Sequence, residues 1–390
     1  MTSVDSAVDN STSVTPADGF IMPTLYKPLH NQKTTAALTT TQAKPHAPLL
    51  TSPEECAAAA CMFFSTLTTD QSFERMDTHG VVDVRPSPRF MRGHVAGSTS
   101  IPWGTNGEIF WSRIHELPPR GVPIAVVSDS GDQVHAVSDF LNQTRVMPIV
   151  FCMVLSDGVV QALTDLNLWT SLEKQPRLPA TDCSHNRDYP RISFSLNLGR
   201  RLWTASHCLR TLAPLVERET IGHSTRAALD IGCAQGRECV WLGMRDSWDV
   251  IVGSDVVQAK LDRYEDLSQR YSTRATMVAL LANVKRAEDD EKVLACAPSG
   301  FSLVHVSRFL YRPMFERVRD ALVRSGGFLV WHTFVEGCEA FGRPKRKRDI
   351  LKRGELAAFF GGSGWKVWMD EVRSLEDGRP VSWFCAQKMT

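Results

Sequence analysis

The segment 228–236, ALDIGCAQG, constrains the fold more than any other part of the chain. Apolar residues run into a Gly-x-Ala-x-Gly turn, and a helix-like pattern follows at 237–242. This order predicts a buried strand that meets a helix N-terminus, where backbone N–H groups and the positive end of the helix dipole face a ligand. A second acid, Asp255, ends the next apolar run 25 residues after Asp230. Since an acid roughly 20 residues on meets ribose hydroxyls in βαβ nucleotide sites, the two features predict a nucleoside-type cofactor.

The bulk properties exclude several classes of protein. The 390 residues are enough for about two domains. With 44 Lys and Arg against 43 Asp and Glu, the net charge of +1 does not favour a nucleic-acid or membrane-surface partner. The sequence has no run of 18 apolar residues, so we expect no transmembrane helix, and the N-terminus has no signal-like pattern. The ten cysteines contain no CxxC pair, so we expect reduced thiols, no metal site and a cytoplasmic location.

Composition and periodicity divide the chain into four parts. Residues 1–51 are rich in Ser, Thr, Ala and Pro, and we expect them to be a disordered tail. Residues 52–174 alternate short strands (81–84, 124–128 and 148–154) with helices (57–67 and 133–142), a pattern typical of a mostly parallel α/β sheet. The proline-containing, apolar-poor segment 175–197 is predicted to be a linker. A second α/β domain occupies 198–390.

The second domain is predicted to contain seven strands. They lie at 227–231, 250–255, 276–280, 301–306, 327–333, 365–372 and 381–388. The turn-rich connector 375–380 joins the last two strands into an antiparallel hairpin. Five strand–helix units followed by a hairpin are typical of one large Rossmann-like nucleotide-binding sheet.

These residues resemble the class I S-adenosylmethionine-dependent methyltransferases, in particular the tellurite-resistance-type enzymes that act on small molecules. The resemblance is carried by LDIGCAQGRECVWL (229–242), GSD (253–255), SRFLYRPMFERVRDALVRSGGFLVWHTF (307–334), FGRP (341–344), LKRGELAAFF (351–360) and DGRPVSW (377–383). It implies S-adenosyl-L-methionine as the cofactor and in-line transfer of the sulfonium methyl group to a nucleophile.

The resemblance also implies a set of cofactor contacts. The turn holds the methionine part, the acid after the second strand holds the ribose, and the residue after the third strand contacts the adenine. These positions correspond to Asp230, Gly232, Ala234, Gly236, Asp255 and Asn283. Ala234 stands where Gly is usual, which costs on the order of 1 kcal/mol if that backbone has φ > 0. Asn283 stands where Asp is more common, although its carbonyl oxygen can still accept a hydrogen bond from an adenine amino group.

Candidates for the acceptor side follow the fourth and fifth strands. Arg308 either orients an anionic substrate or pairs with a surface carboxylate, and Tyr311 beside it is equally open. His332 is either a general base or a hydrogen-bonded core residue between Trp331 and Phe334. The basic run 343–348 is either a solvated loop or lid, a contact for RNA or an anionic substrate, or a targeting signal.

The N-terminal domain resembles the rhodanese (sulfurtransferase) family. VVDVRPSPRFMRGHVAGSTSIP (81–102), IAVVSDSGDQ (124–133) and VLSDGVVQAL (154–163) carry that resemblance. Ser128 stands where the family has its catalytic Cys, and Asp129, Asp132 and Gln133 fill the loop. A hydroxyl is a far weaker acid than a thiol of pKa about 8.5 and cannot carry a persulfide. We therefore expect a catalytically inactive domain, either an interaction or regulatory module or a structural partner of the other domain.

The leading hypothesis is a methyltransferase for a small acceptor such as a thiol or chalcogenide, with a protein partner at the rhodanese-like domain. One alternative is a non-enzymatic binding protein with two degenerate domains. Another is a methyltransferase that acts on RNA or protein, motivated by the basic run. The sequence does not identify the acceptor.

Overall fold

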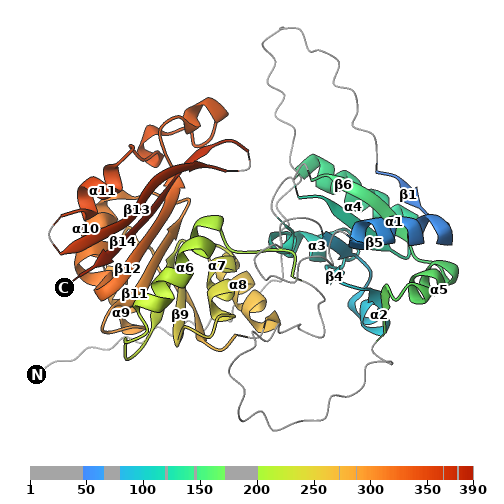
Figure 1. Cartoon of the computed structure of the whole chain (residues 1–390), viewed down its shortest axis with the longest axis horizontal. Helices are drawn as coiled ribbons and strands as arrows, with labels where there is room; N and C mark the ends of the chain where they lie inside the picture. Colours follow the sequence, from blue (N-terminus) through green and yellow to red (C-terminus); the bar gives the residue numbers. More distant parts are fainter. Residues whose placement is uncertain are drawn as a thin grey trace, which may run out of the picture. The chain divides into compact units, whose positions relative to one another are not determined.

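The computed structural model describes residues 47–65, 80–118, 122–144, 147–171, 201–271, 273–286, 288–362, 364–375 and 377–389. They form an N-terminal and a C-terminal α/β half, each with its own main sheet (Figure 1). The predicted linker 175–197 and most of the predicted tail lie outside the described residues.

The N-terminal half contains a five-stranded parallel sheet in the order β1-β6-β5-β2-β4. Its strands are β1 (Leu49–Leu50), β2 (Gly80–Asp83), β4 (Thr99–Ser100), β5 (Ile124–Ser128) and β6 (Ile149–Val154). A separate antiparallel pair joins β3 (His94–Val95) and β7 (Trp169–Thr170). The three strands predicted for this half are therefore present, at or within one residue of their predicted bounds.

Helices cover both faces of this parallel sheet. Its helices are α1 (Pro53–Ser65), α2 (Ser87–Arg92), α3 (Glu108–Ser112), η1 (Ile114–Glu116), α4 (Gly131–Thr144) and α5 (Asp157–Asp165). Val81 packs in one core with α1 and α5, whereas its neighbour Val82 packs in the other with α3 and α4. Successive side chains of a strand point to opposite faces, so a strand buried on both sides is apolar throughout.

Strand β1 corrects the predicted tail. Leu49 and Leu50 pair in parallel with Cys152 and Met153, so order begins before residue 52. The two leucines lie at the end of a polar, proline-rich stretch, and so short an apolar segment is not distinguishable from a disordered tail by composition. The partner strand β6 supplies the hydrogen bonds that make it a strand, as in the bond from Cys152 N to Pro48 O.

The C-terminal half contains a seven-stranded mixed sheet in the order β10-β9-β8-β11-β12-β14-β13. Its strands are β8 (Ala227–Ile231), β9 (Val250–Asp255), β10 (Thr276–Leu281), β11 (Phe301–Ser307), β12 (Val323–Phe334), β13 (Trp365–Ser374) and β14 (Pro380–Lys388). Only β14 runs antiparallel to its neighbours β12 and β13. The predicted seven strands and closing hairpin are confirmed.

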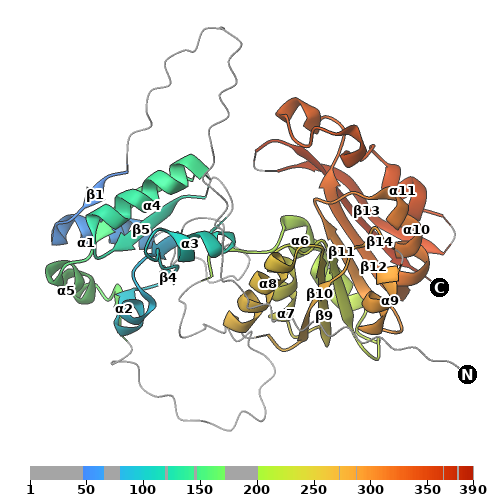
Figure 2. The same ribbon diagram turned by 180° about the vertical axis from the view of Figure 1, so that it is seen from behind.

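Two helical layers sandwich this sheet (Figure 2). On one face lie α6 (His207–Glu219), α7 (Arg237–Gly243) and α8 (Gln258–Arg270), which share a core with Ile251 and Leu303. On the other lie α9 (Glu288–Ala295), α10 (Phe315–Arg317) with the turns η3 (Arg312–Met314) and η4 (Val318–Leu322), and α11 (Glu355–Phe360). Two 3₁₀ turns, η5 (Cys338–Phe341) and η6 (Lys347–Asp349), lie in the loop between β12 and β13.

The strand order creates a topological switch point between β8 and β11. From β8 the chain continues to β9 and β10 on one side, whereas β11 continues to β12 on the other. In open α/β sheets, ligands bind in the crevice at the carboxyl ends of the strands at such a point. None of the described helices combines the length and apolarity needed to cross a membrane.

Candidate cofactor and acceptor site

In the turn after β8, every second residue has a left-handed backbone conformation. Gly232, Ala234 and Gly236 have φ of +74°, +50° and +73°. The positive φ anticipated at Ala234 is therefore present, with its cost of on the order of 1 kcal/mol for a residue that has a Cβ. Gly232 is exposed to solvent, so its backbone remains open to a ligand.

Gly236 is required for a second reason. A Cβ at this position would overlap the ring of the buried Tyr264 on α8. The glycine thus allows α7 and α8 to pack closely behind the turn.

Asp255, at the end of β9, is joined to the turn. Its Oδ2 accepts a hydrogen bond from the backbone N of Ala234 at 3.1 Å, and its Oδ1 accepts one from Val257 N at 3.0 Å. Lys260 Nζ lies 3.4 Å from both oxygens, and its side chain is 38% exposed. A carboxylate has about four lone-pair sites, so two ribose hydroxyls can bind if Lys260 moves outward.

Asp230, which was predicted to contact the cofactor, is 3% exposed and is directed into the core instead. Its Oδ1 lies 2.7 Å from His305 Nδ1, and its Oδ2 accepts a bond from the Cys239 thiol at 3.6 Å. Burial lowers the pKa of His305, but the adjacent Asp230 carboxylate outweighs it and leaves that pKa raised. The pair fixes β8 to β11 beneath the turn. His305 is fully buried, and its contact with Asp230 gives it a structural role.

A cavity of about 330 Å³ lies beyond the ends of β9 and β10. It contains Asn283, the residue predicted to contact adenine, and the apolar side chains of Val256 and Leu281, which are 57% and 50% exposed. Asn283 Oδ1 already accepts a hydrogen bond from Lys285 N at 3.0 Å. A carbonyl oxygen can accept two such bonds, so this atom remains available to an amino group.

Arg308 and His332, two of the three predicted acceptor-side residues, lie at the switch point. Arg308 follows β11 with φ +53°, a strained conformation for a residue with a Cβ, and its N donates to His332 O at 2.7 Å. The neighbouring Phe309 side chain lies over Gly232, since a Cβ there would be 3.9 Å from the ring. The two loops that follow β8 and β11 therefore face each other across the crevice.

His332 is a weak base in this setting. Burial, and then the charges of Arg308 and His305, lower the pKa of His332 to about 3. Ser307 Oγ lies 3.4 Å from its Nδ1, and the side chain is 2% exposed. A base of this pKa takes up little proton at neutral pH, which favours the core interpretation of His332.

Tyr311 lies toward the loop that follows β10. The Lys285 ammonium is 5.6 Å from the centre of its ring. The side chain packs at the margin of the core shared with α9, α10 and α11. Of the three predicted acceptor-side residues, Arg308 and His332 are in direct contact through the backbone, whereas Tyr311 is beside the predicted adenine contacts.

Sequence reasoning missed three groups that border the site. Lys260 lies within the first turn of α8, and nothing in an exposed Lys distinguishes it from a solvated one. Val256 follows Asp255 directly, and Phe309 follows Arg308. The available signal was an apolar residue within two positions of a polar strand end, Asp255 for Val256 and Ser307 for Phe309.

The basic run 343–348 forms part of an exposed loop whose far end is anchored. Arg312 donates to the carbonyls of Arg348 and Ile350, both at 2.9 Å, and to the carboxylate of Glu355 at 2.8 Å. The side chains of residues 345–348 are exposed, which agrees with each of the three predictions for this run and does not distinguish them.

In the N-terminal half, Ser128 is fully buried at the end of β5. Its hydroxyl donates to Gln133 Oε1 and accepts from Ser130 N at 3.2 Å. The hydroxyl is thus occupied inside its own loop. Cys152 is 3% exposed on β6, and burial raises the pKa of its thiol to about 11.

No protein-family model matches this chain. It is similar to the uncharacterized protein UNK4.09 of Schizosaccharomyces pombe, at 24% identity over 347 residues. That match covers 79% of this chain and 93% of the yeast protein. Because the C-terminal half is only about half of the chain, the similarity extends into the N-terminal half.

Several solved methyltransferases resemble about half of the chain. The N-methyltransferase NodS of Bradyrhizobium japonicum is 13% identical and covers 47% of this chain and 97% of its own, with a TM-score of 0.34. The magnesium protoporphyrin IX methyltransferase of Synechocystis, solved with bound S-adenosylhomocysteine, is 13% identical and covers 46% and 82%, with a TM-score of 0.33. A methyltransferase described as putative from Listeria monocytogenes is 12% identical and covers 45% and 97%, with a TM-score of 0.34. These values are too low to assign an activity by themselves.

Proposed function

We propose that the C-terminal half is an S-adenosylmethionine-dependent methyltransferase. The observation that carries this proposal is the hydrogen bond between Ala234 N and Asp255 Oδ2. It joins the left-handed turn to the ribose acid at the switch point of the sheet, beside the cavity that contains Asn283. When bound, the cofactor supplies an electrophilic methyl group on a sulfonium centre.

The chain's own residues provide three parts of such a site. Asp255 would hold the ribose hydroxyls, and Val256 and Leu281 would enclose the adenine, whose burial removes their exposed side chains from water. Gly232 leaves room for the methionine part to approach the backbone. Phe309, above Gly232, would exclude water from the crevice, which favours methyl transfer over side reactions.

The acceptor that fits best is a small soft nucleophile such as a thiol or a chalcogenide. His332 has a pKa of about 3 and is a poor base for an alcohol or an amine. A thiolate needs no base in the transfer step, and the Arg308 guanidinium would favour its anionic form. Positioning at the crevice then supplies most of the rate enhancement.

Calorimetric titration of the full chain with S-adenosylmethionine tests the proposal. Asp255→Asn removes the charge that holds the ribose, and charged hydrogen bonds contribute about 1.5–3 kcal/mol each, so binding should weaken at least about tenfold. Asn283→Leu should weaken binding as well, without touching the turn. Asp262→Asn on the exposed side of α8 is the matched control and should leave affinity unchanged. Unchanged binding in both site variants, or no binding to the wild-type chain, would overturn the proposal.

For the acceptor, incubation of the chain with labelled cofactor and a panel of thiols and chalcogenides should yield a labelled methyl thioether or its analogue. Labelled RNA or protein with an inert small-molecule panel would favour the macromolecular alternative. Cofactor binding without transfer to any acceptor would favour the non-enzymatic alternative.

We further propose that the N-terminal half is an interaction or regulatory module with a protein partner. At the end of β5, Ser128 stands where a rhodanese has its catalytic thiol, and its hydroxyl is buried and hydrogen-bonded within the loop that follows.

A further inference from the structure

The N-terminal sheet has a switch point of its own. Strands β2 and β5 lie side by side, and the chain leaves β2 toward β4 but leaves β5 toward β6, in opposite directions. The crevice at the carboxyl ends of two such strands is the general ligand position in open α/β sheets. In the N-terminal half, a cavity of about 530 Å³ lies at this position, a volume typical of small-molecule sites.

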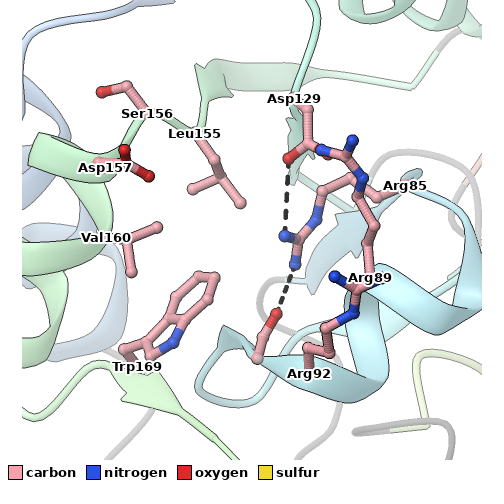
Figure 3. A pocket seen from close by; sticks show the side chains of 10 residues that line it. Arg85, Arg89, Arg92, Asp129, Leu155, Ser156, Asp157, Val160 and Trp169 are labelled. Carbon is pink, nitrogen blue, oxygen red and sulfur yellow. Dashed lines mark hydrogen bonds and ion pairs between the residues drawn. The ribbon is translucent and has the colours of Figure 1, made fainter.

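The cavity has two chemically different walls (Figure 3). Three guanidinium groups, from Arg85 after β2 and from Arg89 and Arg92 on α2, line one side. Across the open space lie the side chains of Leu155, Val160 and Trp169, together with Ser156 and Asp157 at the start of α5. A ligand that satisfies both walls has an anionic end and an apolar body.

Arg85 is a fixed part of the cationic wall. It is 5% exposed, and its guanidinium bonds Asp83 at 2.7–3.1 Å and the carbonyl of Gly93 at 2.8 Å. It also lies 5.5 Å from the centre of the Trp169 ring, where a cation and an aromatic face attract each other. Because Asp83 neutralises its charge, Arg85 shapes the cavity, and the charge that attracts a ligand comes from the other two arginines.

Arg89 and Arg92 differ in their ion pairs. Arg89 is 60% exposed and pairs with Asp129 at 2.6 Å, and Asp129 lies 3.6 Å from Arg85 as well. Arg92 is exposed and has no carboxylate within ion-pair distance among the described residues. The Asp129 carboxylate, 27% exposed, is thus an internal anion at the mouth of the cavity. A stronger anion can take its place on Arg89 and bridge to Arg92.

We propose that this cavity binds a phosphate monoester whose organic part is apolar. The phosphoryl group carries a charge of about −1.5 to −2 at pH 7 and three acceptor oxygens, so it outcompetes the single charge of Asp129 for Arg89 and also engages Arg92. The organic part lies against Trp169, Val160 and Leu155. Asp157 on the opposite wall repels the anionic end and so fixes the orientation. Binding involves no covalent step, because the buried Ser128 does not line the cavity.

Calorimetric titration of the full chain with phenyl phosphate tests this assignment. Phenyl phosphate should bind saturably and more tightly than inorganic phosphate, and phenol should not bind. Arg89→Gln with Arg92→Gln should weaken phenyl phosphate at least about tenfold, the loss expected for charged hydrogen bonds. Asp129→Asn should strengthen binding, because it removes the competing carboxylate. Trp169→Leu should weaken phenyl phosphate while leaving inorganic phosphate unchanged.

Matched controls are available on the same chain. Asp132→Asn changes the same charge one turn away on α4 without lining the cavity, and Arg218→Gln removes an exposed arginine on α6; neither should change affinity. The assignment is overturned if phenyl phosphate does not saturate, if the arginine pair is dispensable, or if Asp129→Asn weakens binding. Equal affinity for phenyl phosphate and inorganic phosphate would remove the apolar wall from the proposal and overturn it as stated.

Discussion

At the scale of single residues, two positions of the turn after β8 differ in the room they leave for a Cβ. Ala234 and Gly236 both have left-handed backbones, with φ of +50° and +73°. Ala234 has a Cβ at its position, whereas a Cβ on Gly236 would meet the ring of Tyr264. Left-handed conformation alone therefore does not decide which glycines the turn requires; the packing behind it does.

Gly236→Ala should destabilise the C-terminal half strongly. The left-handed backbone costs roughly 1–2 kcal/mol for a residue with a Cβ, and overpacking a filled core costs typically about 1–3 kcal/mol. The sum predicts a loss of about 2–5 kcal/mol, measured by urea unfolding. Gly222→Ala is the control, because no atom lies within 4 Å of its added Cβ. A loss below about 1 kcal/mol in Gly236→Ala would contradict the packing found here.

The buried His332 should make the free energy of unfolding depend on pH. Burial, together with Arg308, lowers its pKa from 6.5 to about 3, so the native state excludes a proton that the unfolded chain accepts. This contribution is fully present above pH 6.5 and is lost as the pH falls toward 3, with a slope of at most about 1.4 kcal/mol per pH unit. His332→Gln should therefore reduce the loss of unfolding free energy between pH 6.5 and 4.5.

The comparison is between slopes, since the substitution also changes stability at neutral pH. His135→Gln, on the exposed side of α4, removes a histidine without burial and should leave the slope as in the wild-type chain. Equal slopes for wild type and His332→Gln would mean that the pKa of the imidazole is the same in the folded and the unfolded chain, and would contradict the prediction.

At the scale of elements, Arg312 fastens the basic loop to the rim of the acceptor side. It donates to two loop carbonyls, of Arg348 and Ile350, and to Glu355 at the start of α11. Arg312→Gln loses most of these contacts, each of which is charge-assisted. The loop should then open locally more often, and tryptic cleavage at 345–348 should accelerate about tenfold with little change in global unfolding.

Arg218→Gln serves as the control for this loop, since Arg218 lies on α6 and pairs with its neighbour Glu219. Cleavage at an unchanged rate in Arg312→Gln would show that other contacts, such as the bridge between Val335 and Leu351, hold the loop by themselves.

Element boundaries followed from the sequence where burial on both faces made a strand continuously apolar. The bounds of β5, β8 and β9 agree with their predicted ranges. Strand β1 did not follow, because two leucines have no periodicity and their pairing with β6 is a tertiary contact. The site divides in the same way. The turn and Asp255 have a recognisable spacing, but the ion contact of Lys260 depends on how α8 leaves β9, which no local pattern specifies.

Across the whole molecule, two sheets with separate cores and two candidate sites predict that each ligand stabilises its own half. A ligand at 100 times its Kd raises the free energy of unfolding of the half that binds it by about 2.7 kcal/mol. S-adenosylhomocysteine should therefore slow hydrogen exchange in β8, β9 and β11 but not in β2, β5 and β6, and phenyl phosphate should do the reverse. Asp255→Asn should abolish the first effect alone. If either ligand protected both sheets equally, the two cores would have to unfold as one cooperative unit, and a ligand bound in one half would then be felt throughout the other.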